Sequence, residues 1–134
     1  MAFAMITVSC TQEEKSSIKG TWQTVASETI KPDTVILGSG DGIEIAMYGE
    51  KYVSYFWQEE PKSESDKFFQ GFSFGTYSFE NGVYKDSIVY SSFSDNIGDK
   101  SSANVEFKED TMVFLWDFPD HPEIKVTVFY KKMD

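Results

Sequence analysis

This 134-residue chain has abundant carboxylates, which leave an acid/base pair open, but few candidate nucleophiles and a single imidazole. It contains one cysteine, Cys10, which lies in the N-terminal tail, and one histidine, His121, so no cysteine nucleophile with a histidine partner can be placed. His121 has three nearby acids (Asp117, Asp120 and Glu123), whose spacing favours an exposed turn over a weak cation site. The other carboxylates fall mostly in turns, as solvated side chains do. We therefore expect a protein that is not an enzyme and has no cofactor or metal.

One glycine-rich segment deserves comparison with phosphate-binding loops. The run LGSGDG, from Leu37 to Gly42, has glycines and an acid but lies between two expected strands. A phosphate-binding loop would instead lead into a helix. We interpret this segment as a hairpin loop, or as a lid over a binding site.

The charge of the chain limits the partners it can have. The net charge is -10 at pH 7, and all 12 cationic side chains are lysines. Nucleic-acid binding needs clustered Lys and Arg, so we expect no nucleic-acid partner. An anionic membrane surface would also repel the body of this protein. One cysteine cannot form a disulfide within the chain.

The elements that must position any site are predicted to be strands. Apolar and polar residues alternate along runs rich in β-branched and aromatic side chains, and Gly, Asn, Asp or Pro separate the runs. Eight such runs occur: 20–27, 42–49, 51–58, 68–79, 83–93, 103–107, 111–118 and 123–132. Asn81-Gly82 is the strongest hairpin signal. At Gly75 the aromatic residues change parity, which indicates a β-bulge or a sharp bend.

Short connections between strands predict antiparallel neighbours. The fold class we expect is therefore all-β, an eight-stranded antiparallel up-and-down β-barrel formed by residues 17–134. The interior of a barrel of this size holds its own side chains or one small ligand.

The first sixteen residues have a different character. The run MAFAMITVSC resembles the end of a bacterial lipoprotein signal peptide, and in that pattern Cys10 becomes the lipid-attached first residue of the mature chain. The segment from Thr11 to Ser17 would then be a polar tether. Its acids Glu13 and Glu14 resemble the surface-export signal of Bacteroidetes lipoproteins. The alternative is a tail with an incidental cysteine.

The first expected strand carries a second resemblance. Gly20-Thr21-Trp22 is similar to the G-x-W motif of lipocalins, and residues 17–134 resemble the lipocalin-like domains of Bacteroidetes lipoproteins. The resemblance implies a calycin-type barrel that binds a small hydrophobic molecule, with Gly20 and Trp22 as structural signature residues. Lipocalins place an Arg across this Trp. Here Lys131 or Lys132 would take its place.

Aromatic side chains supply the candidate ligand-binding residues. A cavity could be lined by nine of them, while the alternative is a barrel core filled by its own side chains. The nine are Phe56, Phe72, Phe74, Tyr77, Tyr90, Phe107, Phe114, Trp116 and Tyr130. Runs such as KYVSYFW and MVFLWDF are apolar on both faces, which indicates either cover by other segments or an exposed surface for a partner.

These observations lead to one interpretation and one alternative. The chain is expected to be an extracytoplasmic lipoprotein of the bacterial cell envelope, held at the outer membrane through its lipid alone. Its barrel would bind a small apolar ligand, with loops at Lys31–Gly42 and Glu59–Lys67 gating entry. The alternative is a solid barrel whose exposed aromatic face binds a protein, a glycan or a second copy.

Overall fold

The computed structural model describes residues 17–38, 42–59, 63 and 69–134, and these residues form strands almost throughout. The strands are β1 (Gly20–Lys31), β2 (Thr34–Gly38), β3 (Gly42–Tyr48), β4 (Tyr52–Glu59), β5 (Phe69–Glu80), β6 (Val83–Ser91), β7 (Lys100–Lys108), β8 (Thr111–Asp117) and β9 (Lys125–Lys132). A single turn of 3-10 helix, η1 (Ser94–Asn96), lies between β6 and β7.

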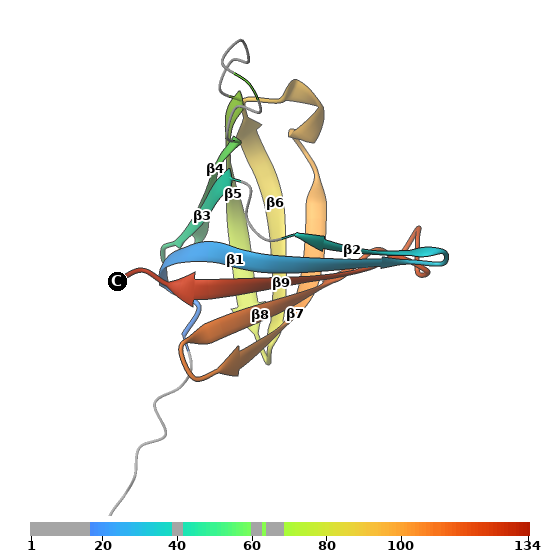
Figure 1. The fold of residues 1–134 in the computed structure, drawn as a ribbon. Coiled ribbons are helices and arrows are strands. Elements are labelled where there is room, and N and C mark those ends of the chain that lie inside the picture. Colours follow the sequence, from blue (N-terminus) through green and yellow to red (C-terminus); the bar gives the residue numbers. More distant parts are fainter. Residues whose placement is uncertain (1–16, 39–41, 60–62, 64–68) are drawn as a thin grey trace, which may run out of the picture.

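Eight of these strands form a closed antiparallel barrel with up-and-down topology. Each strand from β3 to β9 pairs with the next, and β1 closes the ring by pairing with both β3 and β9 (Figure 1). The predicted fold class is confirmed, and the eight barrel strands correspond to the eight runs expected from the sequence.

The ninth strand, β2, was not predicted. The first strand was expected to end at Ser27, but β1 continues to Lys31 and pairs with β2 through a turn at Pro32 and Asp33. The expectation of a loop from Lys31 to Gly42 is therefore wrong for Thr34–Gly38. The five residues of β2 hydrogen-bond to β1 alone and show no buried side chain, so they lack the alternating pattern that marks a half-buried strand. Residues 39–41 lie outside the described part.

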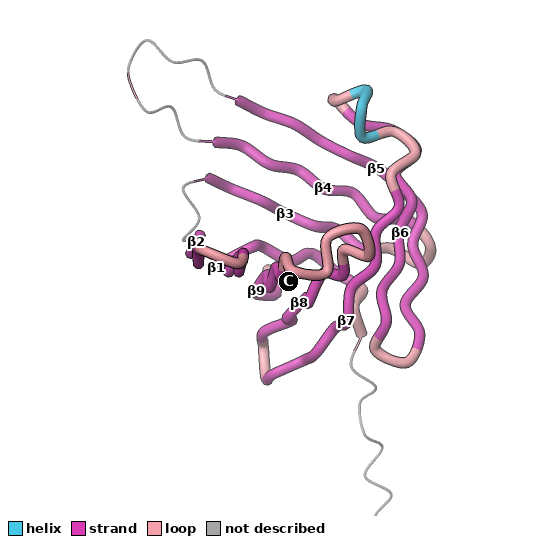
Figure 2. Tube along the Cα trace, turned by 90° about the vertical axis from the view of Figure 1, so that its right-hand side faces the viewer, coloured by secondary structure: helices cyan, strands magenta, loops and turns pink. Residues whose placement is uncertain are grey.

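The two ends of the barrel differ in their connections (Figure 2). At one end, which we call the base, the strand pairs β3–β4, β5–β6 and β7–β8 are joined by short turns. Asn81 and Gly82 both have positive φ (52° and 76°), which confirms the predicted Asn-Gly hairpin. At the other end, the mouth, longer connections follow β4, β6 and β8.

The interior is filled from the base to beyond the middle of the barrel. The largest fully buried side chains are Tyr84, Tyr130, Phe114, Met112 and Val53. Their rings pack closely: Phe114 contacts Tyr84 at 5.1 Å and Tyr130 at 5.3 Å between ring centroids. Offset and edge-to-face contacts of this kind give a dense core, so this part of the barrel leaves little room for a ligand.

Strand β5 explains why the mouth half is less filled. Its inward positions toward the mouth are small residues, Gly71, Ser73 and Gly75, whereas Phe72 and Phe74 point outward. Toward the base the inward positions become aromatic, at Tyr77 and Phe79. The strand keeps its alternation through Gly75. The predicted bulge does occur opposite Phe74 and Gly75, but its extra residue is Val89 on β6.

Candidate functional site

The base of the barrel is sealed around Trp22, which is only 4% exposed. The indole Nε1–H donates a hydrogen bond to the carbonyl of Ile18 (2.8 Å), and so draws the residues before β1 beneath the ring. The ammonium of Lys132 lies 5.7 Å from the ring centroid, so Lys132 is the one of the two expected lysines that makes the cation–π contact. Trp22 therefore acts as a plug.

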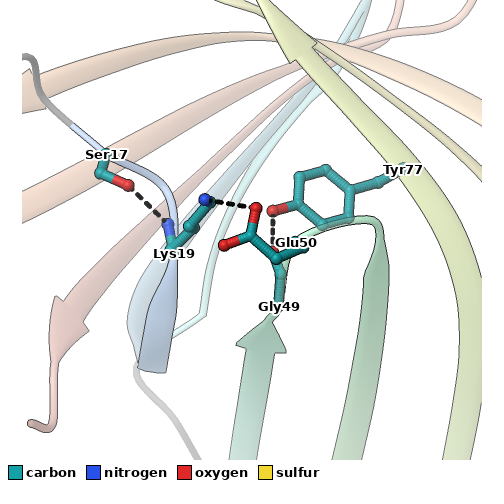
Figure 3. A network of polar contacts seen from close by, with 5 residues as sticks. All are labelled: Ser17, Lys19, Gly49, Glu50 and Tyr77. Carbon is teal, nitrogen blue, oxygen red and sulfur yellow. Dashed lines mark hydrogen bonds and ion pairs between the residues drawn. The ribbon is translucent and has the colours of Figure 1, made fainter.

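A polar network continues this seal at the surface (Figure 3). Lys19 Nζ pairs with Glu50 Oε2 at 2.6 Å, and the Tyr77 hydroxyl donates to the carbonyl of Gly49 at 2.5 Å. These contacts tie the segment before β1 to the β3–β4 turn and to β5. A groove of about 750 Å³ runs beside them, lined by the segment before β1, by the β3–β4 and β5–β6 turns, and by strand residues that include Phe79, Val105 and Phe107. No buried charged side chain lines it.

The nine predicted ligand-binding aromatics separate into two groups. Five face the interior: Tyr77, Phe107, Phe114, Trp116 and Tyr130. Of these, Tyr77 and Phe107 line the base groove, Phe114 and Tyr130 belong to the filled core, and only Trp116 reaches the mouth. The other four lie on the outer face: Phe56, Phe72, Phe74 and Tyr90. They do not line the interior, because strand alternation turns them away from it.

A pocket of about 510 Å³ opens at the mouth, above the filled core. Its floor is formed by inward side chains of five neighbouring barrel strands, β4 to β8, including Tyr55, Asp86, Ser101 and Trp116. Its walls come from the β6–β7 connection, at Asn96 and Asp99, and from the β8–β9 connection, residues 118–121. The pocket therefore combines a rigid floor with loop walls.

The floor is organised around Asp86, a carboxylate that is 7% exposed. Its Oδ2 lies 2.8 Å from the Tyr55 hydroxyl and 2.9 Å from the Tyr84 hydroxyl, and its Oδ1 accepts a hydrogen bond from Ser101. The two phenol oxygens are 2.5 Å apart. Two phenolic protons thus serve three contacts, which makes a compact hydrogen-bonded cluster.

Burial perturbs the ionisation of the groups around this floor. Desolvation is the main cause that raises the pKa of four tyrosines, Tyr48, Tyr55, Tyr84 and Tyr130. For Tyr84 the charge of Asp86 adds to the same effect. Burial also raises the pKa of Glu44, an inward residue of β3. These phenols stay neutral at physiological pH, so they remain hydrogen-bond donors.

Sequence reasoning found Trp116 but missed the polar residues of this floor. Asp86 was treated as one of many acids in turns, but it lies inside a strand at the same parity as Tyr84 and Ile88. A charged residue at an inward position of a half-buried strand is rare and was the available signal. Tyr55 and Ser101 give no comparable signal, because their roles depend on the register of β4 and β7.

The β8–β9 connection holds the only histidine. His121 Nδ1 lies 3.3 Å from Glu123 Oε1, and both side chains are exposed. Within residues 17–38, 42–59, 63 and 69–134, no three His, Cys, Asp or Glu side chains are grouped so as to hold a metal ion.

The outer face of β3 to β6 presents a row of exposed aromatic and aliphatic side chains, which we call the outer aromatic face. It consists of Ile43, Met47, Tyr52, Phe56, Phe72, Phe74 and Tyr90. Tyr52 stacks on Phe74 (5.4 Å between centroids) and Phe72 stacks on Tyr90 (5.8 Å). Tyr90 is 60% exposed, so the stacks lie open to solvent.

Some predicted features fall outside the described residues. These are Cys10 with the whole 1–16 segment, residues 39–41 of the expected lid, and most of the expected gating loop at 59–67. Among the described residues, no helix has the length and hydrophobicity needed to span a bilayer.

Comparisons with known proteins give few matches. No protein family model matches the chain, and no curated protein matches it. Among solved structures it is similar to the crystal structure of an uncharacterized protein from Bacteroides eggerthii DSM 20697, determined at 2.60 Å. The TM-score is 0.48 at 13% sequence identity, and the similarity covers 85% of this chain and 98% of the other.

Proposed function

We propose that this protein is a non-enzymatic binding protein whose barrel mouth holds one small molecule. The mouth pocket supports this proposal, because rigid strands place aromatic surface and convergent polar groups around a space of about 510 Å³. Typical small-molecule pockets measure about 300–1,000 Å³ and combine apolar lining with a few polar groups. Trp116, Ile88 and Phe118 supply the apolar lining, so the ligand has an apolar body.

The mouth is a better site than the larger base groove. The groove lies beside hairpin turns and has an exposed ion pair, Lys19–Glu50, at its edge. The mouth pocket instead has a buried carboxylate and inward hydroxyls. Burial of such polar groups is costly unless they are hydrogen-bonded or paired, so their presence here favours a binding role.

A fluorescence titration tests the binding proposal. N-phenyl-1-naphthylamine, a neutral apolar reporter, is expected to bind saturably with one site per chain. Asn96→Phe adds a ring to the wall of the pocket and should weaken binding at least tenfold, whereas Thr76→Phe, on the outer side of β5, should not. Absence of saturable binding, or equal loss in both variants, would refute a site at the mouth.

We also propose that the protein acts in the cell envelope, anchored by lipid on Cys10. The resemblance of MAFAMITVSC to a lipoprotein signal peptide supports this proposal, and the resemblance of GTW to lipocalins suits a carrier outside the cytoplasm. Metabolic labelling with palmitate should mark the wild-type protein but not Cys10→Ala. An unlabelled wild type would exclude the anchor.

The outer aromatic face supports a second candidate function, the binding of a protein partner or a second copy. Contiguous exposed apolar surface of this kind is uncommon on monomers. If copies associate through it, light scattering should show concentration-dependent dimers that Phe72→Ser abolishes. A monomer at all concentrations would exclude self-association.

A further inference from the structure

We propose that the ligand of the mouth pocket is a small organic cation, an amine whose ammonium group binds Asp86 while its apolar body lies against Trp116. This inference rests on the binding function proposed above and assigns its ligand class. It differs from the small apolar ligand that the lipocalin resemblance implies.

The first argument is the position of Asp86. Its carboxylate is almost fully buried, yet no lysine or histidine among the described residues pairs with it. Buried charges in proteins are normally paired with an opposite charge, because hydrogen bonds alone compensate only part of their lost hydration. Asp86 therefore has the environment of a carboxylate whose counter-ion is supplied from outside.

The second argument is that Asp86 can still accept a hydrogen bond. A carboxylate offers about four acceptor positions. Tyr55, Tyr84 and Ser101 occupy at most three, with Ser101 alone on Oδ1. Asp86 and Ser101 both line the pocket, so a donor that enters it can reach the carboxylate. An ammonium N–H donor would complete the coordination of the carboxylate by charge-assisted hydrogen bonding.

The third argument is the aromatic surface beside the carboxylate. Trp116 and Tyr55 both line the pocket, and Trp116 is held by edge and tilted contacts with Tyr84 (5.9 Å) and Phe114 (5.3 Å). Tryptophan is the best partner for a cation over its ring face. A fixed indole next to a buried carboxylate is thus suited to an amine with an aliphatic or aromatic body.

The fourth argument is the charge at the entrance. Four carboxylates line the pocket, Asp86, Asp99, Asp117 and Asp120, against one lysine, Lys100. None of the four forms an ion pair within the part of the chain that the structure describes. With a net charge of -10, the protein attracts cations and repels carboxylate ligands such as fatty acids.

Three probes that share a phenylethyl body and differ in the charge of their polar group test the ligand class. We would titrate the full chain by calorimetry with 2-phenylethylamine, 2-phenylethanol and 3-phenylpropanoate at pH 7 and low salt. The amine should bind at least tenfold more tightly than the alcohol, as expected for a hydrogen bond to a charged group, and the anion should not bind. Asp86→Asn keeps the side-chain shape and should remove the preference for the amine.

Two further variants separate a local effect from a general one. Asp117→Asn removes a charge at the entrance and should weaken amine binding two- to threefold, with a smaller effect in higher salt. Glu80→Gln removes the same charge at the base and should leave amine binding unchanged. If Asp86→Asn fails to fold, Asp117→Asn and its salt dependence still test the charge argument.

The outcomes separate the ligand class from the proposed function. Equal or tighter binding of the alcohol overturns the cation but keeps a binding site at the mouth. If none of the three probes binds while N-phenyl-1-naphthylamine does, the cation class also fails. If neither the probes nor that reporter bind, the ligand class and the binding function fail together. An equal loss of amine binding in Asp117→Asn and Glu80→Gln would refute a site at the mouth for the amine.

Discussion

Replacement of Trp22 by phenylalanine tests whether the base of the barrel is a sealed plug. The variant loses the indole N–H that donates to the Ile18 carbonyl at 2.8 Å. Ile18 is itself buried, so its carbonyl would be left without that partner. An unpaired buried polar group costs about 1–3 kcal/mol. The weaker contact between Lys132 and the smaller ring adds about 0.5 kcal/mol.

The expected loss for Trp22→Phe is therefore about 2 kcal/mol in the free energy of unfolding. Trp22→Ala, which also leaves a cavity, should lose about 3–5 kcal/mol. For a domain of this size, 2 kcal/mol corresponds to a fall in Tm of about 8 °C. Urea unfolding followed by the fluorescence of Trp57 and Trp116 measures the free energy of unfolding of both variants. Thermal unfolding measures the change in Tm.

Trp57→Phe is the matched control. Trp57 is half-buried toward the mouth, where it stacks on Phe93 at 5.8 Å, and its indole makes no hydrogen bond among the described residues. The same change of ring should therefore cost about 1 kcal/mol or less there. A loss for Trp22→Phe no larger than that for Trp57→Phe would refute the hydrogen-bonded plug.

Three other predictions follow from burial and backbone geometry. Burial raises the pKa of Glu44 above 4.5, so the folded state binds this proton more tightly than the unfolded state does. The stability of the protein therefore falls as pH rises through the raised pKa. Glu44→Gln should be more stable than wild type at pH 7 and should flatten this part of the pH–stability curve, as measured by urea unfolding. Burial likewise raises the pKa of the four interior tyrosines above 10.0, so stability should fall as pH increases beyond about 10. Ultraviolet absorbance should show these phenols ionising only as the protein unfolds, and their ionisation in the folded state would contradict their burial. Gly82 has φ +76°, so Gly82→Ala should cost about 1–2 kcal/mol, whereas alanine at Gly49, which has no positive φ, should cost less in the same thermal assay.

The strands were predictable because most have a face that packs in the core. The run GIEIAMYG has a regular alternation, and β3 buries Ala46 and Tyr48 on one face while Ile43 and Met47 are exposed on the other, so the alternation identifies the strand but not its inward face. Strand β2 has no such face and could not be found in this way. Its conformation depends on hydrogen bonds to the distal half of β1, which no local pattern encodes.

The pocket was harder to predict because it depends on register. In β5, the aromatic side chains are equally prominent on both sides of Gly75, and composition alone does not say which side faces inward. Pairing with β4 decides this: Phe72 lies beside the outward Phe56, while Ser73 lies beside the inward Tyr55. Four of the nine predicted lining residues were therefore placed on the wrong side of the wall.

Two bulges account for the opening of the mouth. Strand β1 pairs with β3 from Gly20 to Gln23, and a bulge between Thr24 and Ala26 then precedes its pairing with β2. Strand β6 pairs with β7 only as far as Ser87, just before its own bulge at Val89. A bulge bends its strand and increases the local twist.

The barrel therefore changes its strand partners close to the level where each bulge lies. Below that level a complete ring of strands encloses a filled aromatic core, and above it the strands have room to diverge. The floor of the pocket forms at this boundary, where Tyr55 and Asp86 are the last inward side chains held by the complete ring. The position of the bulges thus explains how one barrel combines a solid base with an open, acidic mouth.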